Sequence, residues 1–259
     1  MEFKNIIYSQ EDGIAIIQFN RPDDFNAFNL EMLEELDVVL ERIKNDDMIK
    51  AVVIKGNDEV FAAGADLREV INYGPLEVRN YIEKAHAMGL KLYKLSKPTI
   101  ASIAGFCLGG GCELSLSCDM RIAADNAMFG LPEINLGIFP AGGGTQRLAR
   151  IVGYAVAREL ILTGDIFNSN RALEIGLVNK VVPLNELEET TMKLARKLSR
   201  KPPLAVGMIK ELMDYSQHLD PNIGTAIERE KFAVLFASED KTEGMKAFFE
   251  GRKPEFKGK

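Results

Sequence analysis

The hydrophobic positions of the chain follow strand and helix patterns in alternation up to about residue 182. Short apolar runs at 51–55 and 99–104 predict buried strands. Residues 29–44 and 74–95 repeat their apolar positions every three to four residues, and this spacing predicts amphipathic helices. After residue 182 only helical patterns remain, at roughly 184–199, 203–215, 222–237 and 239–250. This order favours an α/β fold with a largely parallel sheet, followed by a helical region.

Shorter patterns complete this outline. An Asp12-Gly13 pair between apolar runs at 6–8 and 14–19 predicts a β-hairpin. Segment 60–67 follows a predicted strand and is rich in small residues, so we expect a loop whose backbone comes close to another group. Further strands are expected at 120–124, 127–129 and 178–182, and further helices at 145–151, 154–162 and 172–175.

A dinucleotide-binding sheet is the main alternative for an alternating strand and helix order. Its fingerprint is a G-x-G-x-x-G turn directly after the first strand. Here no such turn follows the first strand, and the run Gly109-Gly110-Gly111 comes near the middle of the chain. The pattern therefore favours a different α/β fold.

The three consecutive glycines lie between a predicted strand and a predicted helix that carries Glu113. A helix start has unpaired N–H groups and about half a positive charge, and both favour an anion or a developing oxyanion. Glu113 lies three residues after Gly110, so its carboxylate falls on the same helix face. These residues are equally compatible with a glycine-rich turn whose glutamate only complements the helix dipole.

Composition and charge narrow the functional classes. The chain has 259 residues, of which 46% are hydrophobic and 27% charged, as in ordinary soluble domains. A net charge of −6 argues against general nucleic-acid binding, although a few local Lys or Arg side chains could hold an anionic ligand. The sequence has neither an apolar run of about 18 residues nor the layout of a signal peptide, so we expect a cytoplasmic protein without membrane attachment.

The cysteines and histidines exclude several kinds of site. Cys107, Cys112 and Cys118 are an odd number in an apolar helical context, which favours small buried residues over a disulfide framework or a metal site. His86 and His218 are the only histidines, so neither a Ser-His-Asp triad nor a histidine metal centre is expected. We therefore predict no metal.

Six segments occur in a characteristic order along the chain: Asn20-Arg-Pro with Asn26-Ala27, Phe61-Ala-Ala-Gly-Ala-Asp66, Lys97-Pro98, Ala104-Gly-Phe-Cys-Leu-Gly-Gly-Gly-Cys-Glu-Leu114, Phe129-Gly-Leu-Pro-Glu133 and Gly142-Gly-Gly-Thr-Gln-Arg-Leu148. In order and spacing they resemble the motifs of the crotonase (enoyl-CoA hydratase/isomerase) family, and the similarity covers essentially the whole chain. The pair Glu113 and Glu133 is specific for the hydratase branch of the family.

The resemblance implies both a fold and an assembly. Residues 1–198 would form a spiral of ββα repeats that holds the active site. Residues 199–259 would form an all-helical region that packs trimers, commonly as a dimer of trimers, so that we expect a homo-hexamer.

The resemblance also implies a set of site residues. Glu113 and Glu133 would be catalytic and hold the attacking water, and the N–H groups of Ala65 and Gly110 would form an oxyanion hole. Coenzyme A would bind near Ala27, Ala63, Asp66 and Leu67 as part of the substrate, with no separate cofactor. Ala141 stands where relatives often have glycine, and its N–H would help to position the water.

The activity implied is the reversible syn addition of water to a trans-2-enoyl-CoA, giving a 3-hydroxyacyl-CoA in fatty acid β-oxidation, with short substrates such as crotonyl-CoA. Glu113 would orient and deprotonate water while Glu133 delivers a proton to Cα. An enoyl-CoA isomerase, or another acyl-CoA-processing activity, is the alternative. RNA binding through Arg79, Lys84, Lys91 and Lys94 is less favoured because Glu77 and Glu83 share that helix.

Two departures from the family pattern concern the grip on the coenzyme A phosphates. Asp23-Asp24 and Gly251 occupy places where relatives often carry lysine. Arg252, Lys253 and Lys257 are candidate substitutes, and their alternative is a solvated basic tail.

Overall fold

The computed structural model describes residues 3–259 and contains two β-sheets. In the larger sheet all neighbouring strands are parallel except the hairpin formed by β1 and β2. Its spatial order is β1 (Ile6–Glu11), β2 (Ile14–Phe19), β3 (Ala51–Lys55), β5 (Thr99–Ile103), β7 (Met120–Ala124) and β10 (Lys180–Val182). The smaller sheet has the order β4 (Val60–Ala62), β6 (Phe106–Leu108), β8 (Met128–Gly130) and β9 (Phe167–Asn168).

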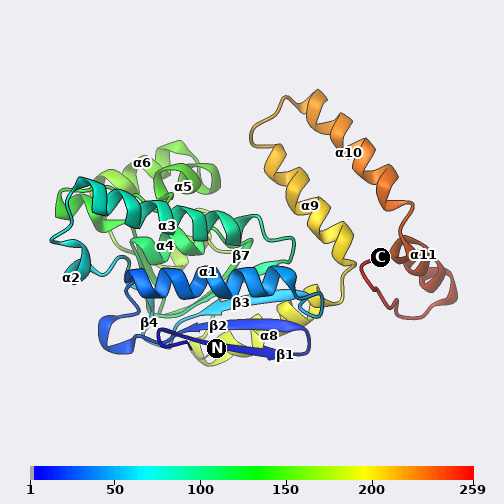
Figure 1. The fold of residues 1–259 in the computed structure, drawn as a ribbon, viewed down its shortest axis with the longest axis horizontal. Helices are drawn as coiled ribbons and strands as arrows, with labels where there is room; N and C mark the ends of the chain where they lie inside the picture. Colours follow the sequence, from blue (N-terminus) through cyan, green and yellow to red (C-terminus); the bar gives the residue numbers. More distant parts are fainter. Residues whose placement is uncertain (1–2) are drawn as a thin grey trace.

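Successive strands pass from the larger sheet to the smaller one. Strands β3, β5 and β7 lie in the larger sheet, and each is followed by a strand of the smaller sheet, namely β4, β6 and β8. A helix then returns the chain to the next strand of the larger sheet (Figure 1). This repetition confirms the predicted spiral of ββα units.

Alternating side chains of the larger sheet face two separate hydrophobic clusters. In β3, Val52 and Ile54 face one cluster, and Ala51 and Val53 face the other. The first cluster includes the apolar face of α1 (Leu30–Asn45) and part of α3 (Pro75–Tyr93). The second includes α8 (Leu187–Ser199), which contacts β3, β5 and β7. The sheet is therefore covered on both faces, as expected for parallel strands.

The predicted elements agree closely with the structure. Helix α1 begins one residue after Asn29, whose side chain accepts a hydrogen bond from the Met32 N–H as an N-cap. Segment 60–67 contains a short strand before its loop, and the predicted 172–175 helix begins earlier. The remaining helices are α2 (Leu67–Val70), α4 (Gly110–Ser115), α5 (Gly144–Val152), α6 (Tyr154–Thr163) and α7 (Ser169–Glu174), with 3-10 helices η1 (Pro22–Asp24), η2 (Pro132–Leu136) and η3 (Leu184–Glu186).

A buried arginine holds the carboxyl end of the short helix α4. The Arg121 side chain donates hydrogen bonds to the carbonyls of Ser115 at 2.9 Å, Cys118 at 2.8 Å and Leu177 at 2.7 Å. Burial lowers the pKa of Arg121, but these carbonyls satisfy its donors at the negative end of the helix. Helix α4, which carries Glu113, is therefore fixed at the end opposite its glycines.

The last three helices are α9 (Pro203–Tyr215), α10 (Pro221–Leu235) and α11 (Glu239–Glu250), and they lie to one side of the sheets (Figure 1). Within the described residues, neither α9 nor α10 has a buried side chain. Lys210 of α9 nevertheless forms an ion pair with Asp119 at 2.7 Å. None of the helices in residues 3–259 is both long and apolar enough to cross a membrane.

Candidate active site

Two backbone segments from distant parts of the chain meet at the amino end of α4. Phe28 pairs with the loop after β4: its N–H donates to the Gly64 carbonyl at 2.7 Å, and its carbonyl accepts from the Asp66 N–H at 2.9 Å. The Ala65 N–H lies between these bonds. Within residues 3–259, the N–H groups of Ala65 and Gly110 have no hydrogen-bond acceptor. Both can therefore bind an external oxygen atom.

The close approach of these segments requires glycine. A Cβ at Gly64, which has a φ of +109°, would lie 3.1 Å from the Gly110 nitrogen. A Cβ at Gly111 would lie 2.2 Å from the Ala62 carbonyl oxygen. At Gly110 itself, a Cβ would meet only ordinary contacts, but it would lie 3.6 Å from the Ala65 nitrogen and crowd the space in front of it. The two free donors are therefore adjacent.

Glu113 is buried, with 4% of its surface exposed, and it packs against the loop before α5. Its Oε1 accepts a hydrogen bond from the Gly144 N–H at 2.7 Å. Burial raises the pKa of Glu113, while the amides of Gly144 and Gly142 and the positive charge of Arg147 oppose this rise. The carboxylate therefore has donors that stabilise its ionised form inside the protein.

Glu133 comes from η2 and has a different environment. Its Oε2 is buried and has no hydrogen-bond partner among the described residues. Burial raises the pKa of Glu133 to about 7, and the negative charge of Glu113 adds to this effect. A buried carboxyl oxygen without a partner normally receives a hydrogen bond from water or a ligand.

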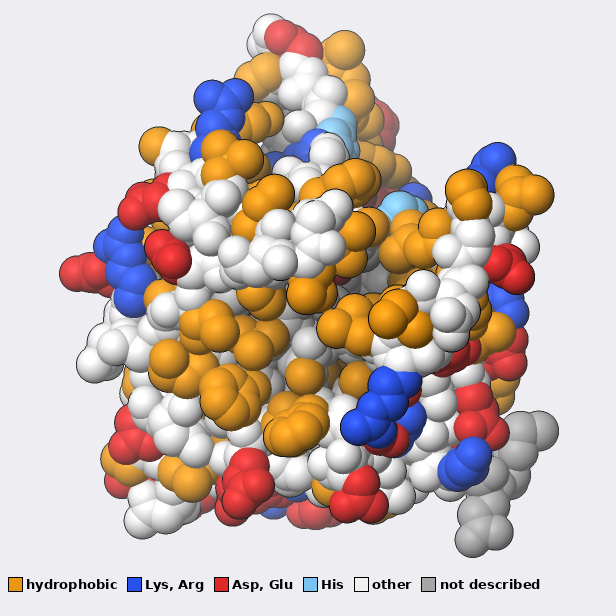
Figure 2. Space-filling view, turned by 90° about the vertical axis from the view of Figure 1, so that its left-hand side faces the viewer, with side chains coloured by type: hydrophobic (Ala, Val, Ile, Leu, Met, Phe, Trp, Pro, Cys, Tyr) orange, Lys and Arg blue, Asp and Glu red, His pale blue; other side chains and the backbone are white. Residues whose placement is uncertain are grey.

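Both acids line one cavity of about 150 Å³. Its walls are mainly apolar and include Leu33, Tyr81, Ile82, Met88, Leu114 and Ile138. Helix α2 contributes Leu67 to the wall, and on the side of the molecule where α2 lies, hydrophobic side chains gather around a hollow (Figure 2). The cavity can therefore hold an apolar group beside two acids and two free amides.

The structure brings together most of the residues that the sequence singles out. The cavity is lined by Ala63, Ala65, Leu67, Gly110, Glu113, Glu133 and Ala141. Ala27 and Asp66 lie outside this lining and meet at Arg21 instead. The Arg21 guanidinium donates to the Ala27 carbonyl and pairs with Asp66 at 2.9 Å. These two residues thus shape the loop that presents Ala65, and their predicted contact with coenzyme A stays a prediction.

Sequence reasoning missed two further residues. His86 and Arg147 hydrogen-bond the carbonyls of Ala141 and Gly142, next to Glu113. Arg147 belongs to the matching segment 142–148, which was a signal that could have drawn attention to it. His86 occurs in an amphipathic helix pattern and carries no comparable signal.

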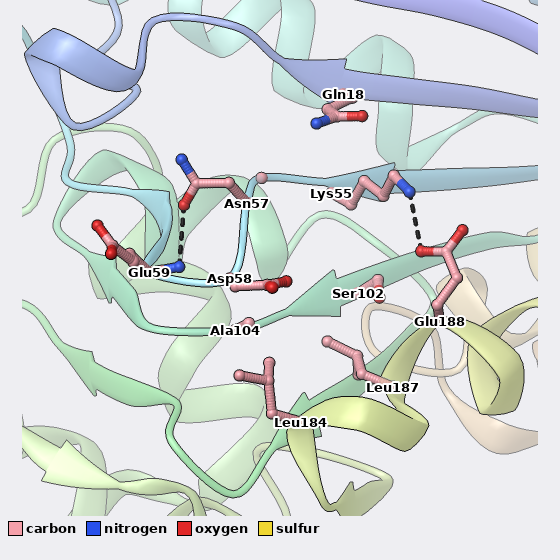
Figure 3. A pocket seen from close by; sticks show the side chains of 11 residues that line it. Gln18, Lys55, Asn57, Asp58, Glu59, Ser102, Ala104, Leu184, Leu187 and Glu188 are labelled. Carbon is pink, nitrogen blue, oxygen red and sulfur yellow. Dashed lines mark hydrogen bonds and ion pairs between the residues drawn. The ribbon is translucent and has the colours of Figure 1, made fainter.

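A larger cavity, of about 430 Å³, lies elsewhere, beside the ends of β3 and β5 (Figure 3). Its lining includes Lys55, whose ammonium group pairs with Glu188 at 2.8 Å. Asn57 accepts a hydrogen bond from the Glu59 N–H across the same region. Among the described residues, this cavity has neither the paired free amides nor the two facing acids of the smaller one, and we place the candidate active site in the smaller cavity. Within residues 3–259, no group of three or more His, Cys, Asp and Glu side chains could hold a metal ion.

The two-sheet spiral, the paired amides and the two acids that line one cavity together define a protein with the crotonase fold. Solved structures support this class. An enoyl-CoA hydratase from Bacillus anthracis superposes with a TM-score of 0.96 at 37% identity, covering 99% of this chain and 100% of that one. An enoyl-CoA hydratase subunit from Geobacillus kaustophilus HTA426 superposes with a TM-score of 0.94 at 40% identity, covering both chains fully.

The chain belongs to the enoyl-CoA hydratase/isomerase family, whose model matches residues 9–259. Among similar curated proteins, the short-chain-enoyl-CoA hydratase of Clostridium acetobutylicum is 42% identical over 256 residues and covers 98% of both chains. The crotonyl-CoA hydratase of Syntrophomonas wolfei is 41% identical over 261 residues and covers 99% of both chains.

The environment of Glu133 predicts an unusual titration. We expect its carboxyl group to be about half protonated at pH 7, because burial and the charge of Glu113 disfavour ionisation. The carboxyl band of Glu133 is measured as a function of pH by subtracting the infrared spectrum of Glu133→Gln from that of the wild type. Glu113→Gln removes the neighbouring charge and should lower the pKa of Glu133. Titration of Glu133 near the ordinary glutamate value of about 4.3 would contradict the prediction.

Proposed function

We propose that this protein is an enoyl-CoA hydratase that adds water to a trans-2-enoyl-CoA and releases a 3-hydroxyacyl-CoA, reversibly. The observation that carries the proposal is the unpartnered, buried Oε2 of Glu133, in the same cavity as Glu113 and two free amides. The similar hydratases of Clostridium acetobutylicum and Syntrophomonas wolfei support it. The acids and amides supply the whole reaction, so no cofactor is proposed beyond the coenzyme A of the substrate.

The free amides of Ala65 and Gly110 bind the thioester oxygen. During hydration this oxygen becomes enolate-like and gains negative charge, which the two N–H donors stabilise without rearranging. One such donor typically lowers the barrier by about 2.7–4 kcal/mol. The pair therefore accounts for a large part of the proposed rate acceleration.

The two acids divide the proton transfers. Glu113, whose ionised form is stabilised by the amides of the 142–144 segment, orients water and takes its proton. Glu133, with a pKa of about 7, is available in the protonated form and delivers a proton to Cα. In this proposal both acids act from one side of the substrate, so that hydroxyl and hydrogen add to the same face. Dehydration uses the same groups in reverse.

We propose a short acyl chain, with crotonyl-CoA as the reference substrate, because the similar curated proteins include a short-chain-enoyl-CoA hydratase and a crotonyl-CoA hydratase. Coenzyme A would follow the surface near Ala27, Ala63, Asp66 and Leu67, with the Ala141 N–H close to the water. Arg252 is a weaker candidate for the phosphates than its sequence position suggests, because it pairs with Glu243 and Glu250.

The alternatives have less support. Moving a double bond within an enoyl-CoA requires no water, and one acid can carry the proton from one carbon to the other, so isomerisation does not call for the second acid. Three of the four basic residues considered for RNA binding are already paired: Arg79 with Glu83 at 2.9 Å, Lys91 with Asp37 at 2.7 Å, and Lys84 with Glu34. The proposed role in β-oxidation and the cytoplasmic location stay predictions from sequence.

We also propose that residues 199–259 form an oligomerisation region, separate from the spiral core of residues 1–198. Within the described chain, no residue of its helices α9 and α10 is fully buried, and large apolar side chains are exposed on them and on α11. Phe232, Phe248 and Phe249 have 60%, 80% and 85% of their surface exposed. Helices of this kind gain stability by packing against other copies.

Glutamine at either acid should abolish most of the activity. We expect Glu113→Gln and Glu133→Gln each to lower kcat for crotonyl-CoA by about 10²–10⁴-fold, because each removes one proton-transfer group. KM should change little. Loss of the ultraviolet enoyl-thioester band measures the rate, and Glu188→Gln, at an exposed ion pair of the other cavity, is the control. Near-normal rates in Glu133→Gln would refute the proposal. A comparison of the rates of the wild-type protein with crotonyl-CoA and hexenoyl-CoA tests the preferred chain length.

Gly110 and Gly111 are neighbours in α4, but their replacement by alanine should have different effects. Gly110→Ala meets only ordinary contacts, so the protein should fold with a nearly unchanged melting temperature, while kcat falls about tenfold or more because the methyl group crowds the oxyanion site. Gly111→Ala places a Cβ 2.2 Å from the Ala62 carbonyl and should destabilise the fold. Thermal unfolding and the hydration assay separate the two effects. Full activity in a folded Gly110→Ala protein would contradict the role of this space.

The helical region predicts an assembly in solution. We expect a particle of three or six chains of 28.7 kDa, measured by size-exclusion chromatography with light scattering. Replacing both Phe248 and Phe249 by Asp should shift the mass toward the single chain, because charge on the exposed apolar face opposes packing. Met48→Asp is the control, because Met48 is an exposed apolar residue outside the helical region, in the spiral of residues 1–198. A wild-type protein that stays a single chain would contradict the proposal.

A further inference from the structure

We infer that Arg147 is a positioning residue for hydration: through its hydrogen bond to the Gly142 carbonyl it fixes the segment whose amides hold Glu113. This inference rests on the proposed function and adds a residue to its machinery. Arg147 does not line the cavity, so it would act through Glu113 rather than on the substrate.

The guanidinium is built into the turn that precedes α5. Its Nη1 donates to the Gly142 carbonyl at 3.1 Å. A Cβ at Gly143 would lie 2.0 Å from Nη1, and Gly143 has a φ of +110°. Only a glycine therefore leaves room for Arg147 inside the turn. The N–H of the next residue, Gly144, makes the 2.7 Å bond to Glu113.

A second side chain fixes the preceding peptide. His86 of α3 lies 2.6 Å from the Ala141 carbonyl through Nε2, which must carry the hydrogen because a carbonyl can only accept. Successive carbonyls, of Ala141 and Gly142, are thus held by α3 and α5. This restricts rotation of the peptides that bring the Gly142 and Gly144 amides to Glu113.

The charge of Arg147 has no carboxylate partner within ion-pair distance in residues 3–259. Burial lowers the pKa of Arg147, and Glu113 is the largest opposing influence. In return the positive charge lowers the pKa of Glu113. Burying a guanidinium charge without a partner destabilises the folded protein unless neighbouring groups interact with it. For Arg147 the strongest such interaction is with Glu113, which must be ionised for the proposed reaction.

The position of Arg147 depends in turn on α9. Its guanidinium lies 5.9 Å from the centre of the Tyr93 ring, and the Tyr93 hydroxyl donates to Asp214 of α9 at 2.6 Å. Burial, followed by Asp214, raises the pKa of Tyr93 to about 12, so the hydroxyl keeps its proton at neutral pH. A continuous set of contacts therefore joins the helical region to Glu113.

The effect on pH dependence follows from the groups around Glu113. His86 and Tyr81 approach from α3, Arg147 from α5 and Glu133 from η2. Glu113 must be ionised to accept a proton from water. Removing the positive charge of Arg147 raises the pKa of Glu113, so the acidic limb of kcat/KM must move to higher pH.

The test compares Arg147→Met and Arg147→Lys with Arg150→Met. Arg150 lies on the same helix and is exposed, so its variant matches the loss of charge without touching the turn. For Arg147→Met we expect kcat with crotonyl-CoA to fall about tenfold to a hundredfold at an almost unchanged KM, with the acidic limb displaced upward. Arg147→Lys keeps the positive charge, so the acidic limb of kcat/KM should stay at the wild-type pH. Its kcat should still fall, because an ammonium group lacks the planar fork of donors that a guanidinium has. Arg150→Met should behave as wild type.

The inference would be overturned if Arg147→Met had the same kcat and the same acidic limb of kcat/KM as Arg150→Met. A loss of kcat in Arg147→Met without displacement of its acidic limb would overturn it too, since general loosening of the fold predicts that result. Thermal unfolding of each variant identifies misfolding. If Arg147→Met does not fold, Arg147→Gln, which also removes the charge, takes its place with the same two criteria. An inactive wild type would instead refute the proposed function, which separates the two failures.

Discussion

The site depends on one backbone contact, in which the loop after β4 and the amino end of α4 approach more closely than side chains allow. Gly64 and Gly111 make this approach possible. Its result is that two amide donors point at the same space while the bonds on either side of Ala65 are satisfied by Phe28. The donors are fixed before any substrate arrives, so no rearrangement is needed when charge develops.

The two acids differ because their surroundings differ. Glu113 receives backbone N–H bonds from the turn before α5, whereas one oxygen of Glu133 is buried and has no partner among residues 3–259. Burial raises the pKa of both acids, but at Glu113 backbone N–H donors and the charge of Arg147 oppose the rise, whereas at Glu133 the charge of Glu113 adds to it. The division of proton transfer proposed here follows from this contrast, not from the spacing of the two glutamates in the sequence.

The sequence predicted the fold well because its information was local. Apolar periodicity located α1, α3 and the strands of the larger sheet, and the glycine run located the start of α4. The residue pattern alone could not show that Glu133 belongs to the site, because the path of the loop after β8 is what brings this acid to the cavity. The family resemblance was needed to single it out. His86 and Arg147 were missed for a similar reason: their neighbours depend on how α3 and α5 pack across the site. Strand β9, with two residues, is too short to produce a pattern.

The second hydrophobic cluster has a consequence for how the chain folds during synthesis. One face of the larger sheet, including Val53, Ile100 and Ile122, is covered by α8, which follows β3 by more than a hundred residues. A nascent chain that has not yet emerged to Ser199 must leave that face open to water. Burial of the face therefore waits for nearly the whole core, and contacts of such long range fold slowly and expose apolar strands to aggregation or chaperones in the meantime.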